Sequence, residues 1–306
     1  MSKDTGRGGV VRAGGRDSRP RLVAVPTLPP DADELIRRAL AEDLGPAGDV
    51  TSRAVVPRGA TAGGRFEAKA DGVVAGLAVA ERVFRAVDPT VEVTWGVADG
   101  DPVSSGDVVG EVRGPARAIL AAERVALNFL THLSGVATAT RRYVEACAGT
   151  ASVVLCTRKT LPGLRAIERA AVEAGGGRLH RFGLSDGVLI KDNHVRLAGG
   201  VEEAVRRARA AVPHTLRVEV EVESIEELSE ALEAGADAVL LDNADLDTVK
   251  RALDVAGDRV PLEVSGGVTL DRIADIAGAG RLLISVGRIT HSAPALDISL
   301  ELWPEP

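Results

Sequence analysis

Six short apolar runs recur through the second half of this 306-residue chain, and no other feature limits its possible folds as strongly. The runs cover residues 153–156, 187–190, 218–222, 238–241, 262–264 and 282–286. Their starts lie roughly 20 to 35 residues apart, which is the length of one strand–helix unit. Helix signals fill the gaps, including a capping box from Ser224 to Glu227 and a helix stop at Gly235. The sequence therefore predicts a parallel sheet made of βα units, and an incomplete α/β barrel fits it best.

A doubly wound sheet would show a similar alternation of strands and helices. Its usual phosphate fingerprint, G-x-G-x-x-G after the first strand, does not occur in the sequence, and neither does a Walker A motif. Six units also fall short of the eight in a closed barrel. The sequence leaves open whether one or two further strands lie in the preceding helical region or do not exist.

The first half of the chain has a different pattern. A helix is predicted over residues 31–44, and short strands over 65–68, 73–77, 91–96 and 108–112. Residues 115–147 carry apolar side chains at helical spacing, and we expect a break near Ser134 and Gly135. This helical region links the two halves of the chain.

Charge and composition argue against several classes of function. A net charge of −7 disfavours binding to nucleic-acid phosphates, and the few aromatics (Phe 4, Trp 2, Tyr 1) disfavour a base-stacking surface. No uninterrupted apolar stretch is long enough for a membrane span, so we expect no membrane contact. Cys147 and Cys156 show neither metal nor disulfide spacing, which is typical of a reducing compartment. We therefore expect a cytoplasmic protein.

Residues 1–30 are rich in arginine and glycine and contain no apolar run of signal-peptide length. We expect a flexible basic tail. A transit peptide is the alternative, but serine is scarce and Asp4 and Asp17 interrupt the basic pattern.

Each of the six apolar runs ends in a polar residue or a glycine. In chain order these are Thr157, Arg158 and Lys159; Lys191, Asp192 and Asn193; Glu221; Asp242 and Asn243; Ser265, Gly266 and Gly267; and Gly287 and Arg288. The carboxyl ends of barrel strands meet on one face, where active sites lie. The sequence therefore predicts that these positions form a single site.

The charges at these strand ends indicate an anionic ligand. Residues 156–196 are net positive within an acidic protein, which suits a phosphorylated sugar or a multiply carboxylated acid. Lys191 follows an apolar run, so its ammonium needs an anionic partner, and a salt bridge to Asp192 or Asp242 is an alternative role. We expect Arg165 and Arg169, one helical turn apart, to be surface residues only.

Glu221 and Asp242 are predicted on adjacent strands. Paired carboxylates there could hold Mg²⁺ or stabilise a cationic centre on a sugar, although they could equally neutralise Lys159 and Lys191.

The glycine-containing strand ends offer backbone N–H groups for a phosphate if helices begin just after them. Among the histidines, His180 and His291 lie near the predicted loops, His132 and His214 look structural or exposed, and His194 stays ambiguous.

Taken in order, these motifs and several others resemble the quinolinate phosphoribosyltransferase family over residues 31–303. The matching segments are residues 42–45, 48–52, 123–128, 157–160, 180–181, 191–194, 219–221, 241–243, 265–267 and 291–292. The resemblance implies an N-terminal α/β sandwich at 31–129, an open α/β barrel at 130–288, and a C-terminal segment at 289–306 that returns to the first domain. It also implies a homodimer in which Arg124 reaches into the partner's site.

The implied reaction belongs to de novo NAD biosynthesis. It converts quinolinate and 5-phosphoribosyl 1-diphosphate to nicotinate mononucleotide, diphosphate and CO₂, with Mg²⁺ on the diphosphate. The implied quinolinate ligands are Thr157, Arg158, His180, Arg181 and the partner's Arg124. Lys159 and Lys191 would face phosphate and the reacting centre, and Glu221 and Asp242 would bind the ribose or its metal. The implied 5-phosphate site is Ser265, Gly266, Gly267 and Gly287, with His291 nearby.

Three alternatives stay open at this point. A paralogous phosphoribosyltransferase of the same fold, such as the relative associated with molybdenum transport, could act on another base, although the arginines and His180 favour a dicarboxylate. A non-catalytic barrel that binds sugar phosphates would tolerate loss of Glu221 or Asp242, and both are present. A lyase or isomerase could use Lys191 as a Schiff base.

Overall fold

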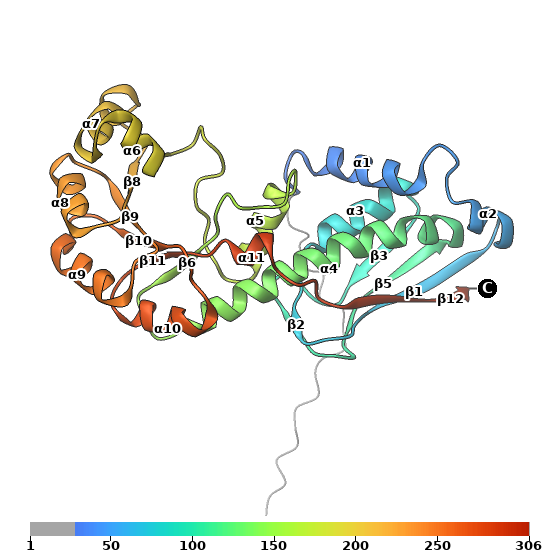
Figure 1. The fold of residues 1–306 in the computed structure, drawn as a ribbon. Coiled ribbons are helices and arrows are strands. Elements are labelled where there is room, and N and C mark those ends of the chain that lie inside the picture. The colour runs from blue at the N-terminus through green and yellow to red at the C-terminus, as the bar shows by residue number, and fades with distance from the viewer. Residues whose placement is uncertain (1–27, 306) are drawn as a thin grey trace, which may run out of the picture.

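The computed structural model describes residues 28–305, and the first 27 residues of the predicted basic tail lie outside this range. Two lobes, one around each main β-sheet, are joined by the long helix α4 (Ala116–Ala146), as Figure 1 shows. α4 runs without interruption across residues 129 and 130, where a domain boundary was predicted.

The N-terminal lobe is built on an antiparallel sheet in the order β12 (Ile298–Glu305), β1 (Thr61–Ala68), β5 (Val108–Pro115) and β3 (Glu92–Trp95). Helices α1 (Ala32–Leu44), α3 (Leu77–Val87) and α4 pack together over this sheet (Figure 1). Between sheet and helices, the Phe66 ring lies 5.9 Å from that of Phe84 and 5.0 Å from that of Trp95. Burial of these three aromatics holds the two layers together.

The remaining N-terminal elements are short. α2 (Val50–Val55) follows α1, and β2 (Gly72–Val73) pairs with β4 (Pro102–Val103) in a separate two-stranded sheet. Of the strand predicted over 73–77, only Val73 lies in a strand, because residues 74–76 lead into α3, which begins at Leu77.

The predicted break in the helical region is wrong, because α4 is one helix of 31 residues. Ser134 and Gly135 are instead contact points. The Ser134 hydroxyl accepts a hydrogen bond from Ala75 N at 3.0 Å, and a Cβ added at Gly135 would lie 2.2 Å from the carbonyl oxygen of Pro294. A small side chain here lets other chain segments approach the helix closely.

The C-terminal lobe contains six parallel strands, as predicted. Their order is β6 (Val153–Leu155), β11 (Leu283–Ser285), β10 (Leu262–Ser265), β9 (Ala238–Asp242), β8 (Val218–Val222) and β7 (Val188–Ile190). β6 and β7 are the two edges, so the sheet formed by the described residues is open. This confirms the prediction of a mixed α/β fold with an incomplete barrel.

Helices connect these strands. They are α5 (Arg165–Ala174), α6 (Asp192–Ala198), α7 (Val201–Ala211), α8 (Ile225–Glu233), α9 (Leu246–Ala256), α10 (Leu270–Gly278) and α11 (Arg288–His291). The predicted cap of α8 forms only in part. Ser224 accepts from Glu227 N at 3.1 Å, but the Glu227 carboxylate accepts from Glu223 N at 2.8 Å instead of from Ser224.

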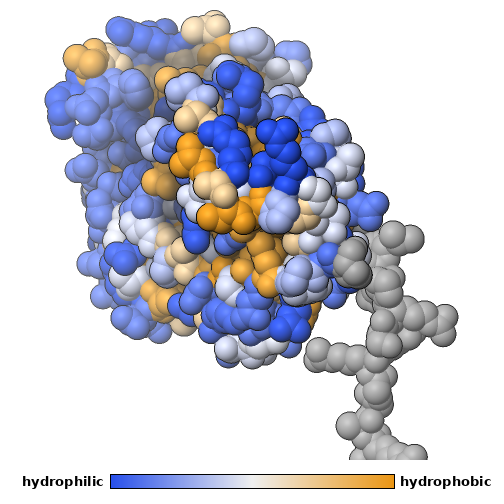
Figure 2. All heavy atoms as spheres, turned by 90° about the vertical axis from the view of Figure 1, so that its right-hand side faces the viewer, coloured by the Kyte–Doolittle hydropathy of each residue, from blue (hydrophilic) through white to orange (hydrophobic). Residues whose placement is uncertain are grey.

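The end of the chain lies in the N-terminal sheet. β12 pairs antiparallel with β1, from Ala68 opposite Ile298 to Thr61 opposite Glu305. Figure 2 looks at this side of the molecule and shows apolar residues among hydrophilic ones. Val50 and Val55 of α2 and Trp303 of β12 are exposed apolar side chains. Among the described helices, none is both long and apolar enough to cross a membrane.

Candidate functional site

A cavity of about 530 Å³ opens at the carboxyl ends of the parallel strands. Most of the predicted site residues line it: Thr157, Arg158, Lys159, His180, Arg181, Lys191, Asp242, Ser265, Gly266 and Gly267. A smaller cavity of about 180 Å³ shares Lys159 and Ser265 with it and adds Gly287 and His291. Five of the six strand ends therefore line the two cavities, as the topology predicts, whereas Glu221 at the end of β8 is buried and lines neither of them.

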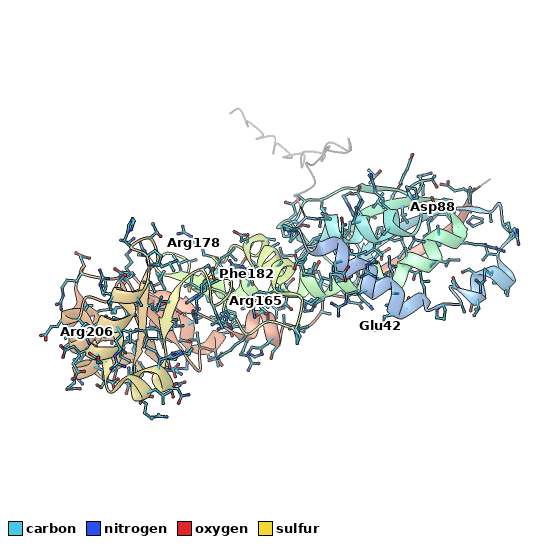
Figure 3. All side chains as sticks on the ribbon, turned by 90° about the horizontal axis from the view of Figure 1, so that it is seen from above. Glu42, Asp88, Arg165, Arg178, Phe182 and Arg206 are labelled. Carbon is cyan, nitrogen blue, oxygen red and sulfur yellow. The ribbon has the colours of Figure 1, made fainter. Side chains whose placement is uncertain are left out.

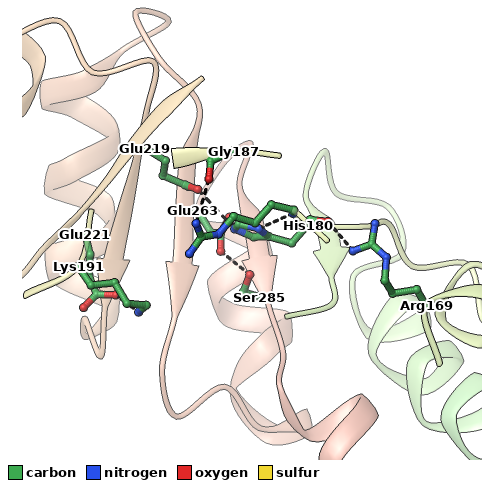
Figure 4. A network of polar contacts seen from close by, with 9 residues as sticks. Arg169, His180, Gly187, Lys191, Glu219, Glu221, Glu263 and Ser285 are labelled. Carbon is green, nitrogen blue, oxygen red and sulfur yellow. Dashed lines mark hydrogen bonds and ion pairs between the residues drawn. The ribbon is translucent and has the colours of Figure 1, made fainter. Parts of the chain in front are cut away.

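The register of the sheet explains one central contact. Ile190 of β7 lies opposite Val220 of β8, so the next residues along each strand, Lys191 and Glu221, come side by side. The Lys191 ammonium forms an ion pair with the carboxylate of Glu221, which is buried. Lys191 therefore has the anionic partner that the sequence predicts, and this partner is Glu221 (Figure 4). The alternative salt bridge to Asp192 or Asp242 is not the one observed.

Asp242 lies at the end of β9, opposite Ser265 of β10. Burial raises the pKa of its carboxyl group, the charge of Glu221 raises it further, and Lys191 and Lys159 oppose both effects. A bound cation would stabilise the ionised form of Asp242, and oxygen ligands of this kind suit Mg²⁺. Glu221 and Asp242 therefore fit the predicted metal in the chemistry of their donors.

A second cationic group faces the other part of the cavity. Burial lowers the pKa of the Arg181 guanidinium, and the charge of Arg158 lowers it further. Arg181 donates to Gly187 O at 2.9 Å, while its buried Nε has no hydrogen-bond partner within residues 28–305. Two facing guanidiniums are an arrangement that an anion with more than one carboxylate would stabilise.

His180 lies in a network with two glutamates that the sequence analysis did not assign. Its Nε2 is 3.4 Å from Glu219 Oε2 and 3.5 Å from Glu263 Oε2, and Ser285 donates to the other oxygen of Glu263 (Figure 4). Within the described part of the chain, His180, Glu219 and Glu263 are the group whose ligand atoms approach closely enough for a metal, all within 4.8 Å. The predicted metal pair, Glu221 and Asp242, does not belong to it.

The two ring nitrogens of His180 have opposite preferences. Nδ1 accepts a hydrogen bond from Arg181 N at 2.7 Å, which requires that nitrogen to carry no proton. The Glu219 carboxylate at Nε2 favours the protonated ring, with a further contribution from the charge of Glu263. The hydrogen bond to Glu219 outweighs the opposing effect of burial, so the pKa of His180 is raised.

Glu263 has the largest shift in this network. Only 2% of its surface is exposed, and burial raises its pKa to about 7, with the charge of Glu219 as the second cause. Strand alternation could have indicated Glu219, since it is two residues from Glu221 and on the same face. Glu263 stands in an apolar strand with no comparable signal.

A helix begins just after the glycine-containing end of β10, which is the condition that the sequence sets for a phosphate site there. Gly266 and Gly267 have φ of +83° and +59°, and α10 begins three residues later at Leu270. A Cβ at Gly266 would lie 2.3 Å from Asn243 Oδ1. Only glycine leaves these backbone N–H groups open to close approach.

Arg124 is exposed on α4 and does not line the cavity of its own chain. Near it, a cavity of about 280 Å³ lies between α1 and α4 and includes Glu42, Asn128 and His132. That cavity is away from the strand ends, so we place the candidate chemistry in the 530 Å³ cavity.

The two arginines expected to be surface residues only have specific contacts. Arg169 donates to His180 O at 2.6 Å, and Arg165 donates to Phe182 O at 3.0 Å. The expectation that they are only surface residues was wrong, because it considered their own helix and not the loop against which the helix packs.

Comparison with known proteins shows which family the chain is similar to. The family described as "Quinolinate phosphoribosyl transferase, C-terminal domain" matches residues 136–301, and the corresponding N-terminal domain matches residues 49–134. The "Probable nicotinate-nucleotide pyrophosphorylase (carboxylating)" of Bacillus subtilis (strain 168) is 42% identical over 270 residues, covering 88% of this chain and 92% of that protein. "Quinolinate phosphoribosyltransferase (decarboxylating) 2, mitochondrial" of Nicotiana glauca is 41% identical over 293 residues, covering 90% and 83%.

Solved structures give the same result. NadC from Streptococcus pyogenes superposes with a TM-score of 0.88 at 40% identity, covering 92% of this chain and 100% of that one. The two family domains match in this order along the chain, over residues 49–134 and 136–301. The chain belongs to the quinolinate phosphoribosyltransferase family.

Proposed function

We propose that this protein transfers the phosphoribosyl group of 5-phosphoribosyl 1-diphosphate to quinolinate and decarboxylates the product, giving nicotinate mononucleotide, diphosphate and CO₂. The observation that carries the proposal is the single cavity at the strand ends, where a cationic half adjoins a half with Asp242, Lys191 and glycines, and Glu221 is buried against Lys191. A pyridine dicarboxylate suits the first half, and an activated ribose phosphate suits the second.

Quinolinate would bind at the cationic half. Arg158 and Arg181 carry the charges, and bidentate guanidinium–carboxylate pairs fix the orientation of a planar ligand. Thr157 and His180 complete the predicted set within one chain. The role of His180 includes holding the backbone of Arg181 through its Nδ1.

The ribose would bind at the other half. Ser265, Gly266, Gly267 and Gly287 would receive the 5-phosphate through backbone N–H groups, with His291 close by. Lys159 and Lys191 would neutralise phosphate charge near the reacting carbon. Glu221 and Asp242 would stabilise the positive charge that develops on the ribose ring.

Mg²⁺ is the cofactor that we propose for this site, held by Glu221 and Asp242 together with oxygens of the substrate. When bound, the ion would neutralise charge on the departing diphosphate. Burial, and then the charge of Glu221, raise the pKa of Asp242, which supports a cation there.

Catalysis on this arrangement is mainly positioning and electrostatics. The pyridine nitrogen forms a bond to the ribose carbon as the bond to diphosphate breaks, and the ring becomes cationic. The carbon–carbon bond to the adjacent carboxylate then breaks, its electron pair stays on the ring carbon, and CO₂ leaves. A proton from solvent completes that ring carbon.

We further propose a homodimer in which the partner's Arg124 completes the quinolinate site. Two observations support it: Arg124 is exposed and absent from the cavity of its own chain, and α2 and β12 leave apolar side chains exposed. A cytoplasmic location is also proposed, since Cys147 and Cys156 are both free and buried.

One assay tests the function. The purified protein is incubated with quinolinate or with nicotinate, each with phosphoribosyl diphosphate and Mg²⁺, and nicotinate mononucleotide and CO₂ are measured. We expect both products from quinolinate only. Activity with another base would indicate a paralogous enzyme, and sugar-phosphate binding without turnover would indicate a sensor. Trapping by borohydride with a carbonyl substrate would indicate a Schiff base on Lys191.

Substitution tests the assigned roles. Lys159→Ala and Glu221→Ala should each fold normally and lose turnover, because both charges act on the reacting centre. Near-normal activity in either variant would refute the roles given to these residues.

A further inference from the structure

Two irregular loops carry the cationic half of the cavity. The first, residues 157–164, follows β6 and includes Arg158, and the second, residues 178–187, precedes β7 and includes His180 and Arg181. Side chains on loops are less precisely held than side chains at strand ends. The separation between the two loops must nevertheless be set by something if they are to hold one rigid ligand.

Arg165, in the first turn of α5, bonds to both loops. Its Nε donates to Thr160 Oγ1 at 3.2 Å, and its terminal nitrogens donate to Arg158 O at 3.4 Å and to Phe182 O at 3.0 Å. One guanidinium thus joins the backbone of Arg158 to the backbone that follows Arg181.

Arg169, one turn further along α5, holds the second loop directly. It donates to His180 O at 2.6 Å (Figure 4). The guanidinium carbons of Arg165 and Arg169 lie 5.9 and 5.2 Å from the ring centre of Phe182, within the range of cation–π attraction. Arg165 and Phe182 lie close together beside α5 in Figure 3.

Between these arginines, Glu168 fixes α5 itself. Its side chain is fully buried, accepts from Leu161 N of the first loop at 3.3 Å and pairs with His132 of α4 at 2.8 Å. The contacts of Arg165 and Arg169 go to loop carbonyls, to the Thr160 hydroxyl and to an aromatic ring. Their effect on a ligand is therefore exerted through the position of the loops.

We propose that Arg165 and Arg169 are positioning residues that set the separation of Arg158 from His180 and Arg181, and thereby the affinity for the dicarboxylate substrate. This inference rests on the proposed function. A guanidinium displaced by about 1 Å loses the geometry of a bidentate pair, and displacements of that size can reduce rates by roughly 100-fold. Apart from Lys159 on the first loop and His291 on α11, the residues assigned to the ribose half stand at strand ends, and Arg169 bonds to the second loop instead.

The test compares Arg169→Ala, Arg169→Lys and Phe182→Leu with Arg206→Ala as a matched control. Arg206 is an exposed arginine of α7 that pairs with Glu203, far from Arg165 and Phe182 in Figure 3. KM is measured for quinolinate at saturating phosphoribosyl diphosphate and then for phosphoribosyl diphosphate at saturating quinolinate. Thermal unfolding of each variant is recorded in parallel.

Arg169→Ala should raise KM for quinolinate by roughly 10- to 100-fold and change KM for phosphoribosyl diphosphate less than about twofold. Arg169→Lys should recover part of the loss, because an ammonium can still donate to His180 O. Phe182→Leu, which keeps an apolar side chain but no ring, should raise KM for quinolinate less than Arg169→Ala does.

Equal increases in both KM values would overturn the inference, as would a quinolinate KM within about twofold of that of Arg206→Ala. If Arg169→Ala fails to fold, the same comparison rests on Arg169→Lys and Phe182→Leu. Wild-type protein that forms no nicotinate mononucleotide would overturn the proposed function and, with it, this inference. Active wild-type protein with unaffected variants would overturn the inference alone.

Discussion

Glu263 offers a direct test of the electrostatics beneath the cavity. It is a carboxyl group with 2% exposure in the apolar strand β10, and burial raises its pKa to about 7. Replacing it by glutamine keeps the shape of the side chain and removes the ionisation. Glu263→Gln should therefore change how stability depends on pH, with little change in packing.

The sign follows from proton binding. Between its ordinary value of 4.5 and about 7, Glu263 has lost its proton in the unfolded chain and keeps it in the folded one. The folded state binds the extra proton, so stability falls as pH rises through this window. The full shift corresponds to about 3 kcal/mol at 1.36 kcal/mol per pKa unit. Glu263→Gln lacks this loss and should gain up to that amount relative to wild type by pH 8.

Neighbouring titratable groups also contribute to the pH dependence of stability. Glu219 of β8, His180, and Ser285 of β11 face Glu263. The raised pKa of His180 also stabilises the fold at low pH, and this stabilisation is lost as pH rises through that pKa. The first cause of the raised His180 pKa is the hydrogen bond to Glu219, which Glu263→Gln keeps. Most of the His180 contribution therefore cancels when the variant is compared with wild type.

The measurement is thermal unfolding of both proteins at pH 5, 6, 7 and 8. The difference in Tm should grow with pH in favour of Glu263→Gln, reaching about 5 °C at pH 8 for a domain of this size. Glu233→Gln, an exposed carboxylate at the end of α8, is the control and should follow wild type. A difference in Tm that stays constant from pH 5 to pH 8 would show that Glu263 is already ionised in the folded protein, and the reasoning would fail.

Two further predictions concern α4. Gly135→Ala should lower Tm by several degrees, because the new methyl group would lie 2.2 Å from a backbone carbonyl oxygen and overpacking of this kind costs about 1–3 kcal/mol. The control, Gly278→Ala, lies in the last turn of α10 with open space around it and should not lower Tm. Equal effects of the two substitutions on Tm would contradict the contact at Gly135. The Arg124→Ala and Lys159→Ala chains should each be inactive alone, and unfolding and refolding them together should recover about a quarter of wild-type activity. Half of the dimers would then be mixed, and each mixed dimer would hold one intact site. A mixture that stays inactive would refute a shared site.

The strand framework of the C-terminal lobe was predictable because its signal is local. Each buried parallel strand is a short apolar run, and the residue that ends it is fixed within one or two positions. Parallel register then places Lys191 beside Glu221 and Asp242 beside Ser265. The sequence could indicate these groups, although not which of them pair.

The parts that escaped prediction depend on contacts outside the helix that carries the residue. Arg169 has the spacing of a surface residue, and its role comes from the carbonyl of His180, in the loop that follows its own helix. Ser134 and Gly135 resemble a helix break, yet they mark where other segments touch an intact helix. Local patterns contain no information about such partners, so propensity alone gives the wrong reading of small and polar residues within helices.

The two halves of the cavity are thus supported by different means. Apart from Lys159, the ribose half stands mainly on strand ends such as Lys191, Glu221, Asp242 and Ser265, whose spacing is set by backbone pairing between strands, and a single substitution changes that spacing very little. The base half stands on two loops whose spacing is set by two arginines and one phenylalanine. Changes around α5 can therefore alter which base is bound while the ribose site is kept. A fold organised in this way can retain one phosphoribosyl donor and accept different acceptors.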